Sequence, residues 1–553
     1  MLASAIALST TALAAVTLTT NVKDGDTISG EFTFKVAVQS ESLVTSVEFY
    51  VGTDLRDTDE STPYEFKVDT LKETQGTFEV TFAAYTKSGE SAKKKITLKV
   101  DNGLENGIGA ALDKGKEAIA NGKWDDALFQ ARVALKIDAN DNRARILMAR
   151  ANLGLGVMDI AERYAEDAVN AEPGNIEALD LYSVVNLKKA FASYARGGDK
   201  TEAITAMGTA LSKAAETRRK SLDLSVDNFG KVDDSNRLAY CDTLMKAGSY
   251  GRVVSELDPL FKKDFKNNDI ANRLLYAQIR AGRFTAALQT LESMRKYGSM
   301  DGFGYAMKAC LMAYFGNTKE ALDAEKEAIL NDPTGLGVQT AQAFLALRRN
   351  DTKTATNIMT RLANSQGQAP VVNYGISALA FLVADYDQSR DRFQTAMLAE
   401  PASYDMLVER GNQTVYFALR TDIENDSKYG ERQRLLAKTY FDAALAARPE
   451  SFEALTGLCC VAMLDGRKSD AINMGRAAVA AGPDYAAAHW AYSAALYNAG
   501  GSDQVKELAK SEAQKASKLD TNGLDGKPYP TPKTAWDYFY GRGRVPWLLG
   551  PGS

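Results

Sequence analysis

The stretch GRFTAAL at residues 282–288 recurs in altered form as GNTKEAL at residues 316–322. The alanine that anchors this motif is Ala287 in the first copy and Ala321 in the second, which sets a 34-residue period. The same spacing continues to Ala355 and Ser389, and each anchor opens an apolar helical pattern after a glycine or polar turn. A fixed period of this length, with one helix–turn–helix in each copy, predicts a repeat array.

The anchor can be followed along most of the chain, which gives eleven candidate units. Seven of the ten steps follow the 34-residue period, and three are longer: from 161 to 203, from 203 to 253 and from 389 to 437. Because the phase returns after each long step, we expect insertions near 176–200, 216–235 and 405–432 that lengthen helices or loops. The anchors are residues 127, 161, 203, 253, 287, 321, 355, 389, 437, 471 and 505.

The repeated unit resembles the tetratricopeptide repeat (TPR) family, in the pattern Gly-x-[Trp/Tyr/Phe]-x-x-Ala-[Leu/Ile]. Besides the two copies above, it is present as GKWDDAL at 122–128 and GRKSDAI at 466–472. The resemblance covers about residues 108–520 and implies an all-α TPR solenoid of about eleven helix–turn–helix units. In this family, ligands lie along the first helices, which line a concave groove.

The groove positions that the resemblance implies are aromatic and apolar, with few charges. They depart from the Lys/Asn/Arg clamp by which chaperone-binding members of the family hold a peptide carboxylate. Such a surface suits an extended apolar or aromatic segment of a partner. The positions are Arg143, Arg150, Tyr276, Phe303, Tyr314, Phe344, Arg348, Tyr374, Phe381, Trp490 and Tyr497.

Residues 16–101 have a different pattern, in which apolar residues alternate with polar ones. Short alternating runs separated by polar turns predict an all-β sandwich. The segments VEFYVG, TPYEFKVDT and FAAYTKSGE resemble bacterial Ig-like modules, without the Cys…Trp…Cys core of antibody domains. This resemblance implies a spacer or an adhesion unit, and residues 102–107 are expected to form a short polar hinge. The alternating runs lie at 32–38, 47–51, 66–68, 78–82 and 96–100.

Both ends of the chain are candidate docking segments. Residues 1–15 are apolar but lack a basic start, so they are either a signal-like segment or the ordered end of a mature chain. They are too short to span a bilayer. Residues 521–553 are rich in Pro, Gly and aromatics, and are either a cap on the last repeat or a docking segment. The candidate residues are Leu2, Ile6, Leu8 and Leu13 at the first end and Trp536, Tyr538, Phe539, Tyr540 and Trp547 at the other.

Composition and motifs argue against several function classes. The net charge of −5 without a long basic run argues against a nucleic-acid binder. Four cysteines lie in no metal-like spacing, and one histidine excludes chemistry that needs a pair. The segment from Asp520 to Gly526 has several Asp and Asn side chains, as calcium-binding loops do. It lacks the Glu that binds calcium through both carboxylate oxygens in such loops. We therefore expect no catalytic, cofactor-binding or metal residue, and note glycosylation sequons at Asn350, Asn412 and Asn425.

Two functional hypotheses follow for a secreted or cell-surface protein that is not an enzyme. In the first, the chain is a structural subunit that self-assembles into a filament through docking of terminal segments between copies. In the alternative, it is a cell-envelope TPR scaffold that holds a partner protein or peptide in its groove. A carbohydrate-active enzyme is a third reading, which rests only on the proteins in which Ig-like modules occur.

Overall fold

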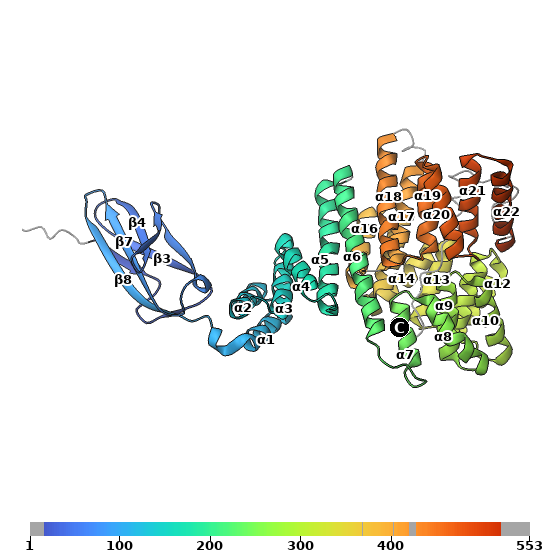
Figure 1. The fold of residues 1–553 in the computed structure, drawn as a ribbon, viewed down its shortest axis with the longest axis horizontal. Coiled ribbons are helices and arrows are strands. Elements are labelled where there is room, and N and C mark those ends of the chain that lie inside the picture. Colours follow the sequence, from blue (N-terminus) through green and yellow to red (C-terminus); the bar gives the residue numbers. More distant parts are fainter. Residues whose placement is uncertain (1–15, 199, 368, 402, 420–426, 521–553) are drawn as a thin grey trace, which may run out of the picture. The chain divides into compact units, whose positions relative to one another are not determined.

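The computed structural model describes most of the chain as strands followed by helices (Figure 1). Contacts between Cα atoms divide it into two compact units, Met1–Ala171 and Glu172–Ser553. The first unit contains the β domain and the first four helices, and the second contains the remaining helices. The described residues are 16–198, 200–367, 369–401, 403–419 and 427–520.

The β domain is a sandwich of two sheets, as the alternating pattern predicts. One sheet has the strand order β1-β3-β6 and the other β2-β8-β7-β4-β5. All neighbouring strands are antiparallel except β2 and β8, which are parallel. The strands are β1 (Thr17–Thr20), β2 (Thr27–Ile28), β3 (Glu31–Gln39), β4 (Val44–Val51), β5 (Asp54–Asp59), β6 (Tyr64–Asp69), β7 (Gly76–Thr86) and β8 (Ser91–Val100).

Four phenylalanines form the centre of the sandwich. Phe34 on β3 is paired in register with Phe66 on β6, and Phe49 on β4 with Phe82 on β7. Their ring centroids lie 5.3 to 5.8 Å apart, and all four side chains are buried. Each ring comes from a strand in which apolar and polar residues alternate. Alternate side chains point to the same face of a strand, so the rings of both sheets meet in one aromatic layer between them.

The Ig-like domain is joined to the first repeat by packed contacts on either side of residues 102–107. Asn102 is buried and accepts a hydrogen bond from the Gly30 amide at 2.9 Å. Leu71, in the short helix η1 (Thr70–Lys72) after β6, is buried in the apolar core of the first repeats. A second short helix, η2 (Leu104–Asn106), leads directly into the first α-helix. Asn102 is therefore bonded within the chain, to the Gly30 amide and to Thr70.

The described part of the array contains 22 α-helices, which form the eleven pairs that the 34-residue period predicts. Each predicted anchor lies on the second helix of its pair. In the first unit the helices are α1 (Gly107–Ala120), α2 (Trp124–Ile137), α3 (Asn142–Gly154) and α4 (Met158–Ala171). In the second they are α5 (Ile176–Gly197), α6 (Thr201–Asp227), α7 (Arg237–Lys246), α8 (Tyr250–Lys263), α9 (Asn268–Arg280), α10 (Phe284–Tyr297), α11 (Gly302–Tyr314), α12 (Thr318–Asn331), α13 (Leu336–Arg348), α14 (Thr352–Gln366), α15 (Pro370–Leu382), α16 (Tyr386–Ala399), α17 (Tyr404–Leu419), α18 (Ser427–Ala447), α19 (Phe452–Leu464), α20 (Lys468–Ala481), α21 (Ala486–Ala499) and α22 (Asp503–Leu519).

Local sequence explains where these helices begin and where they approach one another. Asn267 and Asp301, which occupy the same position in successive repeats, cap α9 and α11 by accepting hydrogen bonds from the amides of Ile270 and Gly304. Small anchors such as Ala287 are fully buried because they allow neighbouring helices to approach closely. The long steps of the period coincide with long helices, since α5, α6 and α18 have 22, 27 and 21 residues.

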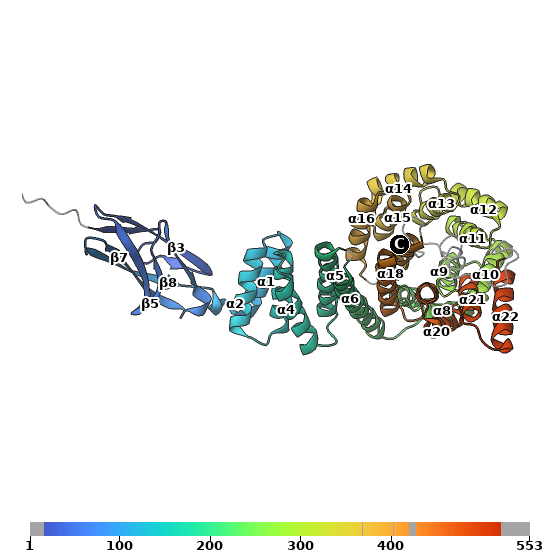
Figure 2. The same cartoon turned by 90° about the horizontal axis from the view of Figure 1, so that it is seen from above.

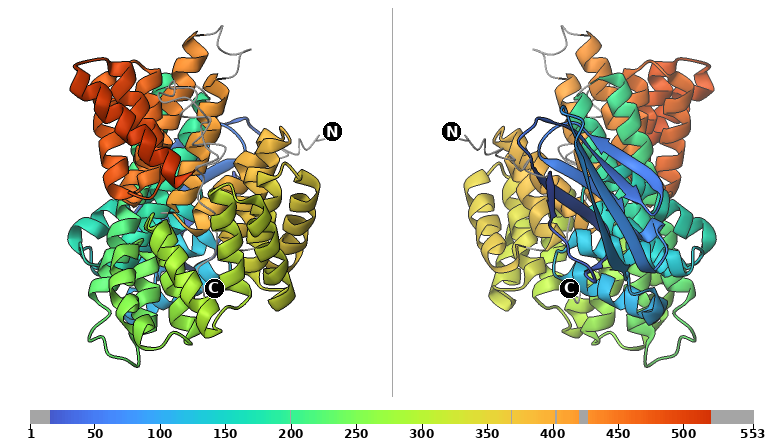
Figure 3. Two further views of the ribbon diagram at one scale, coloured as in Figure 1. Left: turned by 90° about the vertical axis from the view of Figure 1, so that its right-hand side faces the viewer. Right: turned by 90° about the vertical axis from the view of Figure 1, so that its left-hand side faces the viewer.

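Within the second unit, the repeats curve until the last ones pack against the early ones (Figure 2). Helix α18 packs along α6, and the loops around α19 and α21 meet the ends of α9, α10 and α11. Figure 3 (left) shows the orange and red helices α18–α22 next to the green helices. Among the described helices, none combines the length and apolarity that crossing a membrane requires.

Candidate interaction site

The closure of the second unit on itself is made first by a buried charged cluster. Arg280 at the end of α9 forms an ion pair with Asp405 on α17, 125 residues away in the sequence. Arg448, in the turn before α19, donates a hydrogen bond of 2.6 Å to the Arg280 carbonyl. The ring of Tyr250 on α8 lies 5.8 Å from the Arg280 guanidinium and 4.7 Å from that of Arg448. We call these four residues the closure cluster.

Burial shifts the pKa values of the two arginines in the closure cluster. Only 1% of the Arg280 side chain is exposed, and Arg448 is also buried. Burial acts to lower the pKa of Arg280, but Asp405, Tyr250, Tyr276 and Glu453 together outweigh it, and the pKa lies well above its ordinary value. Burial lowers the pKa of Arg448 below its ordinary value. Two guanidinium charges in an apolar interior require nearby oxygens, so the cluster fixes which helices meet.

An aromatic group completes the closure beside the charged cluster. Phe284 on α10 and Tyr314 on α11 pack against Tyr485, before α21, with ring centroids 6.3 and 6.1 Å apart. The Ala486 amide donates a hydrogen bond of 3.0 Å to the Tyr314 hydroxyl. Gly282, at φ +67°, allows the α9–α10 turn to reach this surface, since a Cβ there would lie 3.0 Å from the Phe452 ring. The closure is therefore a packed interior.

All eight aromatic groove candidates lie on first helices of their pairs, but the structure does not bring them together on an open groove. Tyr276 and Tyr314 lie at the closure, where Tyr276 packs against Tyr250 at 6.0 Å. Phe303 is half-buried, and Tyr497 is 48% exposed. The remaining four side chains are buried within the chain: Phe344, Tyr374, Phe381 and Trp490. Six of the eight are thus enclosed, which the period could not show because it describes only neighbouring repeats.

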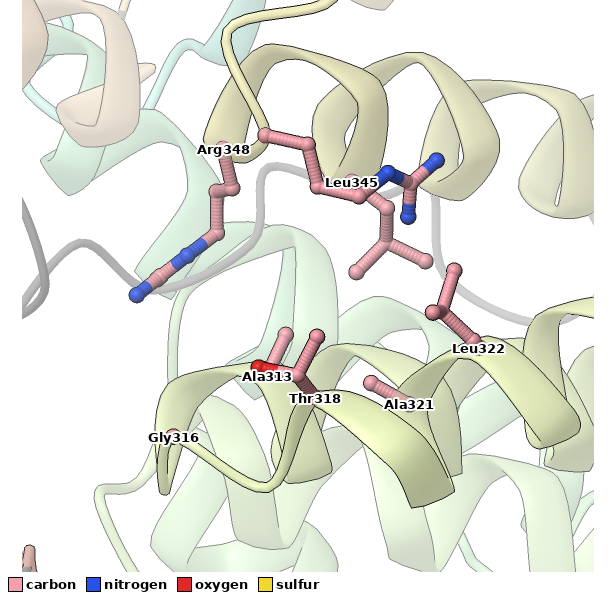
Figure 4. Close-up of a pocket in the computed structure, with 8 residues that line it drawn as sticks. Ala313, Gly316, Thr318, Ala321, Leu322, Leu345 and Arg348 are labelled. Carbon is pink, nitrogen blue, oxygen red and sulfur yellow. The ribbon is translucent and has the colours of Figure 1, made fainter. Parts of the chain in front are cut away.

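The charged groove candidates have separate surroundings. Arg143 is exposed on α3, and its guanidinium lies 2.6 Å from the Asp141 carboxylate. Arg150 lies two turns further along the same helix. Arg348 borders a hollow of about 220 Å³ between α11, α12 and α13 (Figure 4). The hollow is lined by Ala313, Gly316, Thr318, Ala321, Leu322, Leu345, Arg348 and Arg349.

This hollow combines an apolar floor with a cationic rim. Arg349 forms two hydrogen bonds with Glu325, at 2.7 and 3.1 Å, so its charge is already neutralised. The Arg348 guanidinium lies 5.8 Å from the Phe344 ring. Figure 4 shows the Arg348 and Leu345 side chains at the α13 side and Leu322 on the α12 side. A hollow of this size fits one side chain rather than an extended peptide.

An exposed apolar patch lies at the turn between α15 and α16. Leu382 and Val383 are 44% and 59% exposed, and Tyr386 is 40% exposed. Behind them, the Phe381 ring lies 5.7 Å from Tyr386 and 5.4 Å from Phe417 on α17. We call Leu382, Val383 and Tyr386 the turn patch. The groove positions on the first helices include Phe381 but not Tyr386, because Tyr386 opens the second helix α16 at the aromatic position of the motif.

The turn patch also differs from other turns in its backbone. Ala384 has φ +63° at the position where Gly282 and Gly466 have φ +67° and +71°. The left-handed region is unfavourable for alanine, so this turn holds a strained residue at the position where the α9–α10 and α19–α20 turns have glycine. The available signal in the sequence was Ala384, which stands where Gly282 and Gly466 stand in other repeats.

The other candidates are placed as follows. Residues 1–15 and 521–553, with all the terminal docking candidates, lie outside the described residues. The sequon residue Asn425 also lies outside the described residues, whereas Asn350 is exposed and Asn412 is buried in α17.

All four cysteines are buried, and burial raises the pKa of the Cys241 and Cys460 thiols to about 12. Within the described ranges, no group of three His, Cys, Asp or Glu side chains is arranged to hold a metal ion.

Comparisons with known proteins agree with the two-part architecture. Residues 15–82 match the family model of a bacterial Ig domain. No curated protein matches the chain. The APC/C hetero-tetramer Cut9-Hcn1 is similar at 14% identity and TM-score 0.36, covering 74% of this chain and 86% of that one. Yeast Tom70 is similar at 15% identity and TM-score 0.31, covering 74% and 92%.

A third similar structure is YrrB, described as a TPR protein with an unusual peptide-binding site. It has 18% identity and a TM-score of 0.23, and the match covers 36% of this chain and 93% of that one. With TM-scores below 0.5, these likenesses support no statement about the ligands or partners of this chain. The chain thus combines a domain that matches the bacterial Ig family over residues 15–82 with a TPR-like solenoid of paired helices.

Proposed function

We propose that the protein is a non-enzymatic interaction scaffold of the cell surface, which binds a protein partner through the turn patch. The observation that carries this proposal is the exposure of Leu382, Val383 and Tyr386 on a repeat unit whose interior aromatics are enclosed. Exposed apolar side chains that adjoin one another mark interaction surfaces more often than isolated ones do. Closure removes much of the groove as a binding surface, so an external surface is the better candidate.

The surface location is supported by the N-terminal domain. Bacterial Ig domains often belong to extracellular proteins, and residues 15–82 match that family. The packed joint to α1 and α2 would hold this domain at a fixed position beside the first repeats. Digestion of intact host cells with trypsin tests the location, because a surface protein is cleaved while cytoplasmic markers remain intact.

The binding proposal is tested by crosslinking and affinity purification of the full chain from its host. Wild type is compared with a Leu382→Asp, Val383→Asp double variant, and Leu330→Asp is the matched control because Leu330 is 76% exposed but lies away from the patch. We expect one partner to be recovered with wild type and with L330D, and to be lost with the double variant. Recovery that is equal for all three proteins would reject the turn patch as the binding surface.

Self-assembly into a filament is the second candidate, and one feature of the sandwich favours it. Strand β6 is an edge strand of six residues whose known ladder partner is β3 on one side. The edge strand β5 of the other sheet carries three aspartates and is largely exposed, a charge pattern that opposes strand addition. A strand from another copy would therefore add to the β1-β3-β6 sheet, at β6 or at its other edge strand β1. Electron microscopy of wild type and of a variant lacking residues 2–15 tests this, since unchanged filaments would exclude residues 2–15 as the donor.

A further inference from the structure

The hollow between α11, α12 and α13 lies at a motif position that other repeats fill with an aromatic ring. That position is Trp124 on α2, Tyr250 on α8 and Phe284 on α10. On α12 it is Thr318, which lines the hollow. Because protein interiors are close-packed, replacing a ring by this short side chain leaves a space of about one ring. The hollow is therefore the place of an aromatic side chain that this repeat does not itself supply.

In the other three repeats, the ring packs on the first helix of the next pair, at the residue thirty positions later in the chain. The ring centroids of Phe284 and Tyr314, for example, are 4.7 Å apart. The residue thirty positions after Thr318 is Arg348, and both border the hollow. The filled pairs are Trp124 with Gly154, Tyr250 with Arg280 and Phe284 with Tyr314.

The hollow has the size and the chemistry to receive one aromatic side chain. Ala321 and Leu345 line it and are buried, whereas Leu322 is 36% exposed, so a side chain can enter from the surface (Figure 4). Its volume of about 220 Å³ exceeds the roughly 150 Å³ at which an apolar cavity holds benzene. At the rim, the Arg348 guanidinium lies 5.8 Å from the Phe344 ring. A guanidinium is attracted to the face of an aromatic ring, and indole is its best partner of this kind.

The described part of the chain ends close to this hollow. Leu519, at the end of α22, packs against the core of the second unit, and Asp520 is buried. Burial raises the pKa of the Tyr314 hydroxyl above its ordinary range, and the nearby Asp520 carboxylate acts in the same direction. Tyr314 directly follows Ala313, which lines the hollow. Residues 521–553 therefore start within reach of the hollow.

We propose that Trp536, in the C-terminal segment 521–553, fills the hollow and completes this repeat as the aromatic residues of other repeats complete theirs. Trp536 lies sixteen residues after Asp520. Sixteen residues of random coil span about 20–24 Å on average, so the tether presents the indole to the hollow at a high effective concentration. Asp537 follows directly, and its carboxylate complements the Arg348 guanidinium at the rim.

The second tryptophan of the segment suits the hollow less well. Trp547 is preceded by Arg542 and Arg544, which would bring two further cations to a cationic rim. Like charges repel at such short distances, whereas Trp536 brings a carboxylate. Trp547 is therefore the matched control for Trp536 in the experiments below.

This contact would fasten the end of the array to its middle. The segment follows α22, and the hollow belongs to α11, α12 and α13. An occupied hollow would also be closed to the side chains of a partner. The inference does not rest on the turn patch, because the turn patch lies at α15 and α16.

Photo-crosslinking of the full chain tests which surface receives Trp536. p-Benzoylphenylalanine replaces Trp536 in one protein and Trp547 in the control, so both keep an aromatic side chain. After irradiation at low protein concentration, mass spectrometry of the peptides locates the adducts. We expect position 536 to react within one chain at Leu322, Leu345 or their neighbours, and position 547 not to react there. Adducts elsewhere, or none, would overturn the proposal. Adducts that join two chains would also overturn it, and would assign the hollow to the segment of a second copy.

Filling the hollow from within tests the same contact by hydrogen–deuterium exchange. Thr318→Trp supplies the absent ring, and Thr352→Trp is the matched control because Thr352 has the same motif position in the next repeat. We expect the amides of residues 530–540 to exchange about tenfold faster in T318W than in wild type, since burial of one aromatic side chain contributes a factor of this order. T352W should match wild type. Equal exchange in T318W and wild type would reject the contact.

A double-variant comparison separates docking from damage to the repeat. Trp536→Ala should increase exchange of the α12 and α13 amides in the wild-type background and should have no further effect in the T318W background. Effects of W536A that are equal in both backgrounds would mean that Trp536 does not use the hollow. Leu322→Asp, which places a charge at the exposed side of the hollow, replaces T318W if that variant does not fold.

Discussion

Arg132 of α2 donates a hydrogen bond to the carboxylate of Asp69, the last residue of β6, and so joins the first repeat to the Ig-like domain. A second contact of 3.3 Å runs from Arg132 to Glu31 at the start of β3. Together with buried Leu71 and Asn102, this pair makes the joint a packed interface. The Ig-like domain and α1–α4 therefore belong to one compact unit.

Replacing Arg132 with alanine should loosen this joint. The guanidinium is three-quarters buried, with 24% of the side chain exposed, and hydrogen bonds to charged groups contribute about 1.5–3 kcal/mol. We expect the amides of η1 and η2 to exchange with deuterium about tenfold faster in the variant than in the wild type. Arg56→Ala is the control, because Arg56 pairs with Glu73 at 3.5 Å on an exposed edge. Unchanged exchange in R132A would mean that apolar packing alone holds the joint.

The β domain shows which strands can be predicted from the alternation of apolar and polar residues. It predicts β3, β4, β6, β7 and β8, since each has one face in the sandwich core. It misses β5, whose sequence DLRDTD buries no face and which pairs with β4 through its backbone at a sheet edge. It also misses the joint, because Arg132 and Asp69 are 63 residues apart and a charged pair leaves no periodic trace.

The same distinction separates the repeats from their closure. The 34-residue period predicts the helix pairs because each anchor packs against the adjacent unit. Arg280 and Asp405 meet across 125 residues, and the contact depends on curvature accumulated over several repeats. This curvature is the sum of small rotations between successive repeats. The sequence of one repeat therefore does not show how far the whole array curves. The groove candidates lie on the first helices of their pairs, and two of them, Tyr276 and Tyr314, lie at this closure.

The closure predicts a large cost for removing its carboxylate. Asp405→Asn removes the carboxylate that pairs with the buried Arg280 guanidinium, and breaking a buried ion pair costs about 3–5 kcal/mol. Urea unfolding followed by circular dichroism measures the change. Asp387→Asn is the matched control, because Asp387 forms a pair with Arg390 while 84% of its side chain is exposed. The control should be nearly neutral, and a D405N variant as stable as D387N would show that the closure does not depend on this pair.

The thiols should be unreactive in the folded protein. Burial raises the pKa of Cys241 and Cys460 to about 12 and that of Cys310 and Cys459 above the ordinary range. At pH 8 these groups are thiols, whereas the thiolate is the nucleophile. A disulfide reagent such as DTNB should therefore label no cysteine at pH 8 until urea unfolds the chain, and then all four. Fast labelling of the native protein would contradict the packed structure around these residues.

Gly282 and Gly466 provide a comparison that isolates the close approach at the closure. Both have positive φ, at +67° and +71°. An alanine at either position would therefore destabilise the folded chain by about 1–2 kcal/mol through its left-handed backbone alone. A Cβ at Gly466 meets no atom within 4 Å, whereas one at Gly282 would lie 3.0 Å from the Phe452 ring and 3.2 Å from the Gly482 Cα. Gly482 belongs to the backbone after α20, so it cannot move aside as a flexible side chain would.

Gly282→Ala should therefore destabilise the chain more than Gly466→Ala. Overpacking typically adds about 1–3 kcal/mol to the backbone term, and urea unfolding of the two variants measures the difference. Exchange of the amides around Phe452 and Tyr485 locates the effect, since only G282A should increase it there. Equal stability of the two variants would mean that the α9–α10 turn and the α20–α21 turn lie further apart in solution. The repeats would then form an open array, and the enclosed aromatics would again be available to a partner.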